Sequence, residues 1–535
     1  MRRCARLTEL LIALMVVGAL FLASCSATST STPQSITTAT TKPYGNIVVA
    51  ADFTSGGFDA ASVNVVPDFY GAIFEGLTTT GTTNQDVPDI AEKWEISTDG
   101  LTYTFYIRKG VRFHNGDYLN GADVKFSLDR MLAPDAVYKS SASWRTIIAS
   151  VELKDDYTVV LRLKQPQFDL LEDVEGMTAV LPKKYIEEKG IEYFRANPVG
   201  SGAWKFVKYQ PGVRLDLEAN EDYWDQTKVP QFKNLTVLHV KEESTKVAML
   251  KTGELDLATI TPDSVSGLKA AGLRVTSFFG GTRYFVYAWY DVDNPGKYAL
   301  GDVRVRKALQ LALNRQEMLD KLLLGYGNIT VVHAVSTNAY FFDPNVLKPD
   351  PYDPEQAKKL MAEAGRPSGF NMKVWDSGAG GLLSMLNQSM AGYWQKIGIT
   401  PQLVPIEYTQ FVTYFRPNHN PIIWDSVWSY IGYDYRDFLG MGRIYSFTKS
   451  VTKLYKNPKL DESIDKVNGM PASPERTRLA IEAAATVKND YAAIAVVGPD
   501  QILALSSKIG GVKPKVPPLG MLFGGASYAT ASHAK

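Results

Sequence analysis

The stretch that indicates the fold most clearly is Leu101–Arg130, LTYTFYIRKGVRFHNGDYLNGADVKFSLDR. In residues 101–107, apolar side chains occupy every second position, which is the period of a strand with one buried face. Asn120 is a suitable N-cap for the helix that follows, and Val124 and Leu128 lie on one side of that helix. The stretch therefore predicts a half-buried strand followed by an amphipathic helix.

Strand and helix patterns continue to alternate along the chain. Residues 46–51 (NIVVAA) and 213–217 (VRLDL) have the pattern of strands. Helical spacing runs over Asp302–Leu324, where Asp302 is the expected N-cap and Gly325 the expected stop. This alternation predicts the α/β class. A length of 535 residues predicts two or more lobes, because one hydrophobic core rarely extends over so long a chain.

Charged residues near the helix ends are expected to be structural. Asp123 and Arg130 fit a solvated helix face and its cap, and Arg304 and Arg306 fit ion pairs on the surface. The Gly-Ser-Gly run at residues 200–202 suits a tight turn. It lacks the G-x-S-x-G spacing of a nucleophile elbow.

Composition excludes some function classes. The chain has 57 basic and 56 acidic residues, and this balance gives no reason to expect nucleic-acid binding, which usually leaves a basic surplus. Its 2 cysteines both precede residue 26, so we expect neither a disulfide nor a thiolate metal site in the folded part.

The N-terminus has the form of an export signal. Three arginines precede the apolar run Leu10–Ala23, which is shorter than the ~20 residues that a membrane span needs. The run ends in Leu-Ala-Ser-Cys25, which resembles the lipobox of bacterial lipoproteins, where the cysteine is acylated. We therefore expect residues 1–25 to be a lipoprotein signal peptide. Residues 26–44, which are rich in Ser and Thr, are expected to form a flexible tether.

A further likeness covers nearly all of the remaining chain. Six segments, in this order, resemble the characteristic blocks of the extracytoplasmic solute-binding proteins of ABC importers, family 5, which include oligopeptide, dipeptide and nickel-type binding proteins. These segments are Arg108–Arg130, Asn197–Gly212, Leu250–Leu257, Asp302–Arg315, Tyr352–Gly365 and Lys396–Phe411.

The resemblance implies a two-lobed periplasmic-binding-protein fold of type II, from the large cluster with an extra subdomain. The first lobe would comprise residues 45–280 and 498–535, with the subdomain at about 76–194, and the second lobe residues 281–497. It also implies a monomer that captures a small solute by hinge closure and delivers it to ABC permease subunits. No cofactor is expected. The lipid anchor would hold the protein outside the cytoplasm at the cell membrane, on its periplasmic side or its outer face.

The stretch Trp424–Gly440, WDSVWSYIGYDYRDFLG, combines aromatic rings with a few charges, as ligand pockets do. Taken alone, it also fits a core strand and turn. Family peptide binders hold the ligand's ammonium group with an acid in a D-Y-x-[DE]-P segment, which the segment beginning at Asp434 resembles. The other residues expected at the ligand are Trp424, Trp428, Tyr430, Tyr435, Tyr408, Phe58 and Arg416.

Departures from the family pattern leave the ligand open. Phe438 replaces the proline of that segment, and no arginine lies in residues 425–432, so Arg416 is the nearest upstream candidate for a ligand carboxylate. A peptide or related organic amine is the first expectation. A sugar, an opine-like compound or another organic amine also fits a pocket that is rich in aromatic residues and poor in arginine. A metal chelate bound indirectly is a further alternative.

The sequence bears on three other function classes. A protein-ligated metal site is not indicated, because the 5 histidines do not pair at ligand spacing; they are His114, His239, His333, His419 and His533. The sequence contains no G-x-S-x-G, Walker, H-E-x-x-H or dinucleotide-binding motif. A membrane-anchored hydrolase remains the competing class, and a solute receptor for a sensor is a third.

Overall fold

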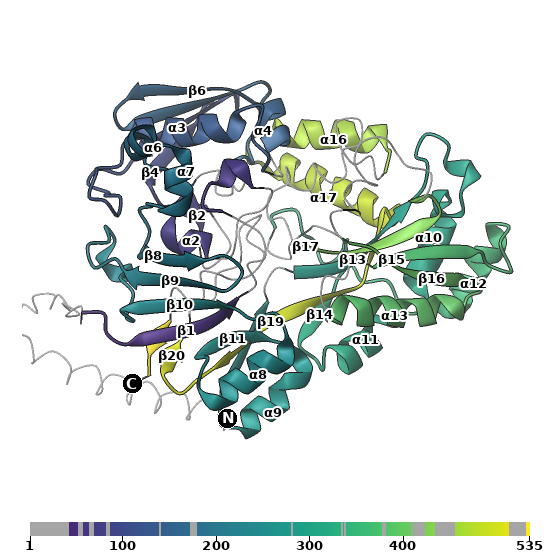
Figure 1. Ribbon diagram of the computed structural model, residues 1–535. Coiled ribbons are helices and arrows are strands. Elements are labelled where there is room, and N and C mark those ends of the chain that lie inside the picture. The colour runs from purple at the N-terminus through teal and green to yellow at the C-terminus, as the bar shows by residue number, and fades with distance from the viewer. Residues whose placement is uncertain are drawn as a thin grey trace, which may run out of the picture. The chain divides into compact units, whose positions relative to one another are not determined.

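The computed structural model describes most of the chain after residue 41 (Figure 1). The described residues are 42–51, 57–63, 69–81, 86–138, 141–171, 179–279, 282–332, 335, 339–376, 381–407, 410, 423–433, 455–512 and 531–534. Residues Lys42–Lys535 cluster as one compact unit. The predicted signal and most of the predicted tether lie outside the described residues. Within the described ranges, no helix has the length and apolar character needed to cross a bilayer.

The first sheet has eight strands and is built around β1 (Asn46–Ala51), a strand whose bounds match the prediction. β1 pairs in parallel with β10 (Asn234–His239) and β11 (Leu257–Ile260). The other members, all in antiparallel pairs, are β8 (Trp204–Gln210), β9 (Arg214–Ala219), β12 (Arg274–Phe279), β14 (Gly327–Ile329) and β19 (Val497–Leu505). One face packs in the largest core and the other packs under α8 (Glu243–Thr252) and α9 (Val265–Ala270).

The second sheet has five strands in the order β16-β15-β17-β13-β18. Their bounds are β13 (Thr282–Trp289), β15 (Asn371–Asp376), β16 (Thr400–Pro405), β17 (Ser426–Tyr433) and β18 (Ala493–Ala495). β15 pairs in parallel with β16 and β17, whereas β13 pairs antiparallel with β17 and β18.

β13 is buried on both faces, as its apolar sequence requires. Tyr284, Val286 and Ala288 join the core formed with α10 (Val303–Leu311) and α13 (Gly381–Gln395). The alternate residues Phe285, Tyr287 and Trp289 join a different core, formed with α16 (Pro458–Asn468) and α17 (Pro474–Asn489). The second sheet is therefore a middle layer between two sets of helices.

A third, antiparallel sheet forms the subdomain in the order β4-β5-β7-β6. β5 (Thr102–Ile107) confirms the predicted alternation, since Tyr103, Phe105 and Ile107 are buried and the residues between them are half-buried. Its neighbours are β4 (Ala91–Ile96), β7 (Thr158–Leu163) and β6 (Ile148–Asp155). The remaining described α-helices are α2 (Tyr70–Ile73), α3 (Gly121–Leu132), α4 (Ser141–Ile147), α6 (Lys183–Lys189), α7 (Ile191–Ala196), α11 (Arg315–Leu322) and α12 (Pro354–Glu363). Two small sheets have two strands each: β2 (Thr78–Thr80) with β3 (Asp86–Pro88), and β20 (Ile509–Gly511) with β21 (Ser532–His533).

The helix caps are partly as predicted. The Asn120 side chain accepts a hydrogen bond from the Ala122 amide at the start of α3, and Asp302 caps α10. The prediction of one helix over Asp302–Leu324 is wrong. The chain breaks after α10, and Asn314 caps the separate helix α11 through the Glu317 amide.

Three charged residues are more buried than their positions suggested. Asp123 is buried because its carboxylate accepts hydrogen bonds from two backbone amides, those of Asn120 and Lys183. Arg130 is half-buried and pairs with Asp59. Arg304 does pair with Asp302 at the surface, but Arg306 is buried and donates to backbone carbonyls.

The two edges of the second sheet are formed differently. β16 is largely exposed and carries Pro401 and Pro405 within its six residues. At the opposite edge, the side chain of Gln310 acts as a partner for β18. Its amide nitrogen donates to the Ala495 carbonyl at 2.9 Å, and its oxygen accepts from the Ala495 amide at 2.8 Å.

The predicted turn at residues 200–202 packs against α2 so closely that side chains would clash. A Cβ at Gly200 would lie 2.0 Å from the Ile73 carbonyl oxygen. The turn is fixed by His114, whose Nδ1 accepts from the Gly200 amide at 3.3 Å and whose Nε2 donates to the Gly202 carbonyl at 2.9 Å. Burial lowers the pKa of His114 from 6.5 to about 4.

This shift predicts a loss of stability in acid. His114 is neutral in the folded protein and would gain a proton on unfolding, so its contribution is complete above pH 6.5 and is lost as the pH falls toward 4. We expect a decrease of the unfolding free energy on the order of 3 kcal/mol from this group. The measurement is urea unfolding at several pH values. His114→Gln should have a shallower pH dependence than the wild type, and equal slopes in the two proteins would contradict the assignment.

Candidate functional site at the end of β17

The chain passes from the first sheet to the second before β13 and returns after β18. Between these points it also visits the first sheet at β14, which pairs with β19. β12 ends at Phe279, which pairs with Asp500 in the first sheet, and β13 begins at Thr282 in the second sheet. On the return, β18 leads through Val496 into β19, and the Val496 amide donates to the Tyr284 carbonyl at 3.2 Å. The return crossover is therefore hydrogen-bonded to β13 near the start of that strand.

β17 ends at these crossovers. Its last residue, Tyr433, pairs with Thr282, the first residue of β13. Asp434 follows directly in the sequence, although Asp434, Tyr435, Tyr408 and Arg416 lie outside the described residues. β17 therefore ends at the junction of the two sheets, one residue before the predicted acid.

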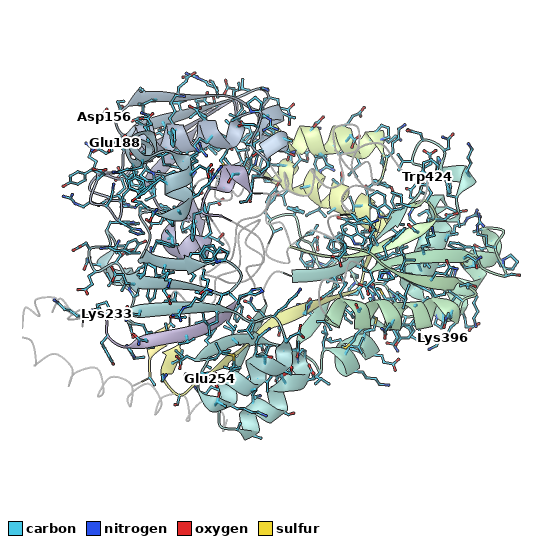
Figure 2. The ribbon with its side chains drawn as sticks, in the orientation of Figure 1. Asp156, Glu188, Lys233, Glu254, Lys396 and Trp424 are labelled. Carbon is cyan, nitrogen blue, oxygen red and sulfur yellow. The ribbon has the colours of Figure 1, made fainter. Side chains whose placement is uncertain are left out.

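Trp424 lies at the other end of β17 (Figure 2). Eight strand residues at ~3.3 Å each separate the two ends by roughly 25 Å. The Trp424 ring packs against Tyr298 with ring centroids 5.0 Å apart, and the Asp425 carboxylate accepts from the Leu300 amide at 3.0 Å. That Trp424 lines one cavity with Asp434 stays a prediction.

Trp428 and Tyr430 lie along the strand between these ends. Trp428 is buried, pairs in register with Trp375 and Tyr287, and packs in the core under α16 and α17. Tyr430 is opposite Phe285 in the register, and its side chain is outside the described part. Of the predicted aromatic residues on β17, Tyr430 is therefore nearer to the crossovers than Trp428.

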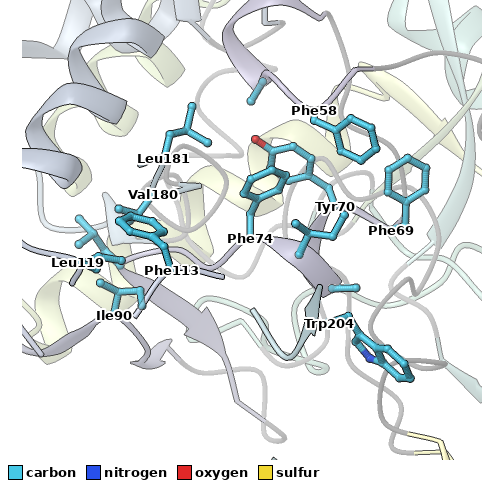
Figure 3. Close-up of a cluster of buried hydrophobic side chains, with 14 of the residues drawn as sticks. Phe58, Phe69, Tyr70, Phe74, Ile90, Phe113, Leu119, Val180, Leu181 and Trp204 are labelled. Carbon is cyan, nitrogen blue, oxygen red and sulfur yellow. The ribbon is translucent and has the colours of Figure 1, made fainter. Parts of the chain in front are cut away.

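Phe58 is a core residue (Figure 3). Its side chain is only 1% exposed, and its ring contacts Phe206 and Tyr209 edge to face, each with a centroid separation of 5.3 Å. This burial gives Phe58 a core role, and its contact with ligand stays a prediction.

The neighbouring Asp59 holds a buried charge cluster that the sequence analysis missed. Its carboxylate is fully buried and pairs with Arg130 at 2.7 Å and with Arg195 at 3.0 Å. The partners are 71 and 136 residues away in the sequence, so no local pattern could reveal them. Burial, and next the charge of Asp59, raise the pKa of the adjacent Tyr70 hydroxyl. This cluster ties the loop after β1 to α3 and α7.

A second buried acid, Glu75, was also missed. Its carboxylate accepts hydrogen bonds from the Tyr223 hydroxyl and from the Trp224 indole at 3.0 Å. Burial, followed by repulsion from Asp89, raises the pKa of Glu75 to about 8. The described residues include no cluster of three His, Cys, Asp or Glu side chains arranged to hold a metal. Glu75 is therefore a buried acid rather than part of a described metal centre.

Comparison with known proteins identifies the family. Residues 86–448 match the profile described as "Bacterial extracellular solute-binding proteins, family 5 Middle". The chain belongs to this family. This match confirms the prediction made from the six segments. The protein is a family 5 solute-binding protein. Members of this family are binding proteins rather than enzymes, and they act outside the cytoplasm.

Individual relatives agree with this assignment. The dipeptide-binding protein of Escherichia coli (strain K12) is 30% identical over 400 residues, covering 67% of this chain and 70% of the relative. The solved structure of DppA from Helicobacter pylori in complex with the peptide STSA has a TM-score of 0.75 and 23% identity, covering 92% of this chain and 98% of that one. NikZ from Campylobacter jejuni in complex with Ni(L-His) has a TM-score of 0.76 and 21% identity, with coverage of 91% and 99%. These structures confirm the predicted two-lobed α/β fold.

The core position of Phe58 yields a stability prediction. Phe58→Ala should lower the unfolding free energy by about 3–5 kcal/mol, because truncating a buried ring removes apolar contacts and leaves a cavity. The measurement is the midpoint and slope of urea unfolding. Val137→Ala, at a side chain that is 55% exposed, is the control and should change stability by less than about 0.5 kcal/mol. A cost at Phe58 as small as that at Val137 would contradict the core placement.

Proposed function

We propose that the protein is the substrate-binding component of an ABC importer and that it captures a short peptide by the peptide's free amino group. The observation that carries the proposal is the course of β17, which brings the chain to the junction of the two sheets just before Asp434. A binding group at such a junction can contact a ligand held between two bodies.

The two crossovers are the proposed hinge. Each consists of a few residues between rigid strands, so small changes of backbone angle there would rotate one sheet relative to the other. Hinge closure around a ligand is a known motion of periplasmic binding proteins. The ligand would favour the closed form because it contacts both lobes only in that form. The proposed lobes are residues 45–280 with 498–535, and residues 281–497, with the subdomain at about 76–194.

The proposed ligand chemistry follows from the acid. A carboxylate enclosed in a closed cleft is unfavourable without a partner, and a ligand ammonium group would supply that partner. Exclusion of water on closure would strengthen the attraction. The name of the Escherichia coli relative, a dipeptide-binding protein, supports a short peptide. Tyr408, Tyr430 and Tyr435 would provide aromatic contacts beside the acid, and Arg416 would meet the ligand carboxylate.

We also propose that the protein is a monomeric lipoprotein attached through Cys25. The support is the charged and apolar N-terminal segment that ends in Leu-Ala-Ser-Cys. Acyl chains on this cysteine would bind the membrane by burying CH₂ groups, at ~0.8 kcal/mol each. Residues 26–44 would then separate the folded part from the membrane and let it reach the permease.

The ligand proposal predicts selective binding of peptides with a free amino terminus. Unmodified dipeptides should raise the thermal unfolding midpoint, because a ligand of the folded state stabilises it. Their N-acetylated forms should not, because acetylation removes the positive charge. Asp434→Asn should weaken binding of the same dipeptides by ~2–5 kcal/mol, as expected when a buried charge loses its partner. Isothermal titration calorimetry measures this difference.

Asp425→Asn is the matched control, because the Asp425 carboxylate bonds the Leu300 amide within the fold. It should leave dipeptide affinity unchanged. Equal binding of free and acetylated dipeptides would remove the ammonium contact from the proposal. Stabilisation by a sugar or by nickel–histidine alone, without turnover, would replace peptide by that ligand, and turnover of a peptide or oligosaccharide would favour a hydrolase.

The anchor proposal is tested at the 2 cysteines. Cys25→Ser should abolish incorporation of labelled fatty acid and leave the protein uncleaved or released from the membrane, because the acylated thiol is absent. Cys4→Ser, within the proposed signal peptide, should incorporate label as the wild type does. Electrophoresis and membrane fractionation measure the label and the location of each variant. Continued labelling of Cys25→Ser would refute the assignment.

A further inference from the structure

A buried ion pair joins the subdomain to the helices on the second sheet. Asp169 lies in the segment that follows β7 of the subdomain, and Arg476 lies in the first turn of α17. The Arg476 guanidinium is 2.6 Å from an Asp169 carboxylate oxygen, and the two side chains are only 6% and 12% exposed. Burial alone would lower the pKa of Arg476, but the Asp169 carboxylate raises it above its usual value.

A third side chain completes this contact. The Tyr340 hydroxyl donates to the Asp169 carboxylate at 3.2 Å, and the Arg476 guanidinium lies over the Tyr340 ring, 4.8 Å from its centroid. Arg476 is held on its own side by a hydrogen bond from Nε to the Val467 carbonyl at 3.2 Å. Asp169 therefore inserts between two groups that are already positioned by the second-sheet body.

Backbone hydrogen bonds fix the segment that carries Asp169. The Phe168 amide donates to the Asn468 carbonyl, at the end of α16, at 3.0 Å. On the subdomain side, the Gln167 amide donates to the Gly100 carbonyl at 3.0 Å, and the Tyr103 hydroxyl donates to the Gln167 carbonyl at 3.1 Å. The segment is thus part of the subdomain body and touches the second-sheet body directly.

This contact is separate from the two crossovers. The subdomain shares its core with the first sheet, whereas α16 and α17 share theirs with the second sheet. Figure 1 labels α16 and α17 next to the subdomain, and the Phe168–Asn468 hydrogen bond confirms that they meet. A rotation at the crossovers that separated the two sheets would have to break this contact.

We propose that Asp169, Tyr340 and Arg476 form a clasp that fastens the two lobes in the closed form without any ligand. The proposal rests on the hinge in the proposed function. Opening breaks the ion pair, the hydroxyl bond and the Phe168–Asn468 bond together. The clasp therefore shifts the ratio of closed to open protein before a solute arrives. A ligand that needs the closed form would bind more tightly as that form becomes more populated.

The test uses ligand-free protein. Asp169→Asn removes the charge and keeps the side-chain size, and Glu475→Gln on the same helix removes an exposed ion pair with Arg478 as the matched control. Small-angle scattering reports the radius of gyration. Amide hydrogen exchange followed by mass spectrometry reports local opening, since the Phe168 amide is protected only while it bonds Asn468.

We expect Asp169→Asn to shift the radius of gyration to a larger value and to accelerate exchange in residues 164–171, while β5 and β7 keep wild-type exchange. Glu475→Gln should change neither quantity. The clasp is refuted if Asp169→Asn behaves as Glu475→Gln does. If exchange in Asp169→Asn rises throughout β5 and β7, the substitution has loosened the subdomain itself. The variant Tyr340→Phe then tests the clasp. Faster exchange confined to residues 164–171 in Tyr340→Phe supports the clasp, and wild-type exchange in that variant refutes it.

These measurements are independent of ligand identity. A protein that opens as expected in Asp169→Asn but binds no dipeptide would retain the clasp and lose the proposed peptide ligand. A protein that binds dipeptides but shows no effect of Asp169→Asn would retain the proposed function and lose the clasp.

Discussion

The arrangement of the molecule depends on the pairing of strands where the chain changes sheet. Phe279 is paired in the first sheet, and Thr282 is already paired with Tyr433 in the second. The return crossover is the single residue Val496, and its amide is bonded to the Tyr284 carbonyl of β13. Short connections between extended, well-paired strands confine any relative motion to a few backbone angles. The same pairing determines which end of β17 lies at the junction, and therefore which residues can act there.

The parts of the fold with local causes could be predicted from the sequence. The alternation in β5, the Asn120 and Asp302 caps and the family blocks all depend on neighbouring residues. The break between α10 and α11 was missed because the apolar stripe continues through it, and only the Asn314 cap marks it. Contacts between distant residues could not be predicted. Burial of Phe58 among aromatic rings from β8 and its surroundings is such a contact, because a loop phenylalanine gives no sign of whether it faces a cavity or a core.

The buried ion pairs are of two kinds, which differ in whether both partners belong to the same core. Asp59 is enclosed by Arg130 and Arg195 from elements of the same core, so its pairs would persist in any position of the proposed hinge. Asp169 and Arg476 come from bodies with separate cores, so their pair exists in one relative position. Both pairs lose hydration on burial. Charge attraction and hydrogen bonds within each pair offset that loss of hydration energy. A fixed pair adds rigidity within a lobe, whereas a pair between lobes can select a conformation. The candidate acid on the β17 side differs from both, because its proposed partner is a ligand.

The edges of the second sheet affect whether the protein aggregates at high local concentration. Exposed strand edges are templates for pairing with other chains, and they lead to aggregation or fibre growth. Pro401 and Pro405 have no amide hydrogen, so β16 cannot offer a continuous row of donors. At the other edge, Gln310 already occupies the backbone groups of Ala495 in β18. If the proposed anchor concentrates the protein on a membrane, these two edges let the sheet stay open without polymerising through it.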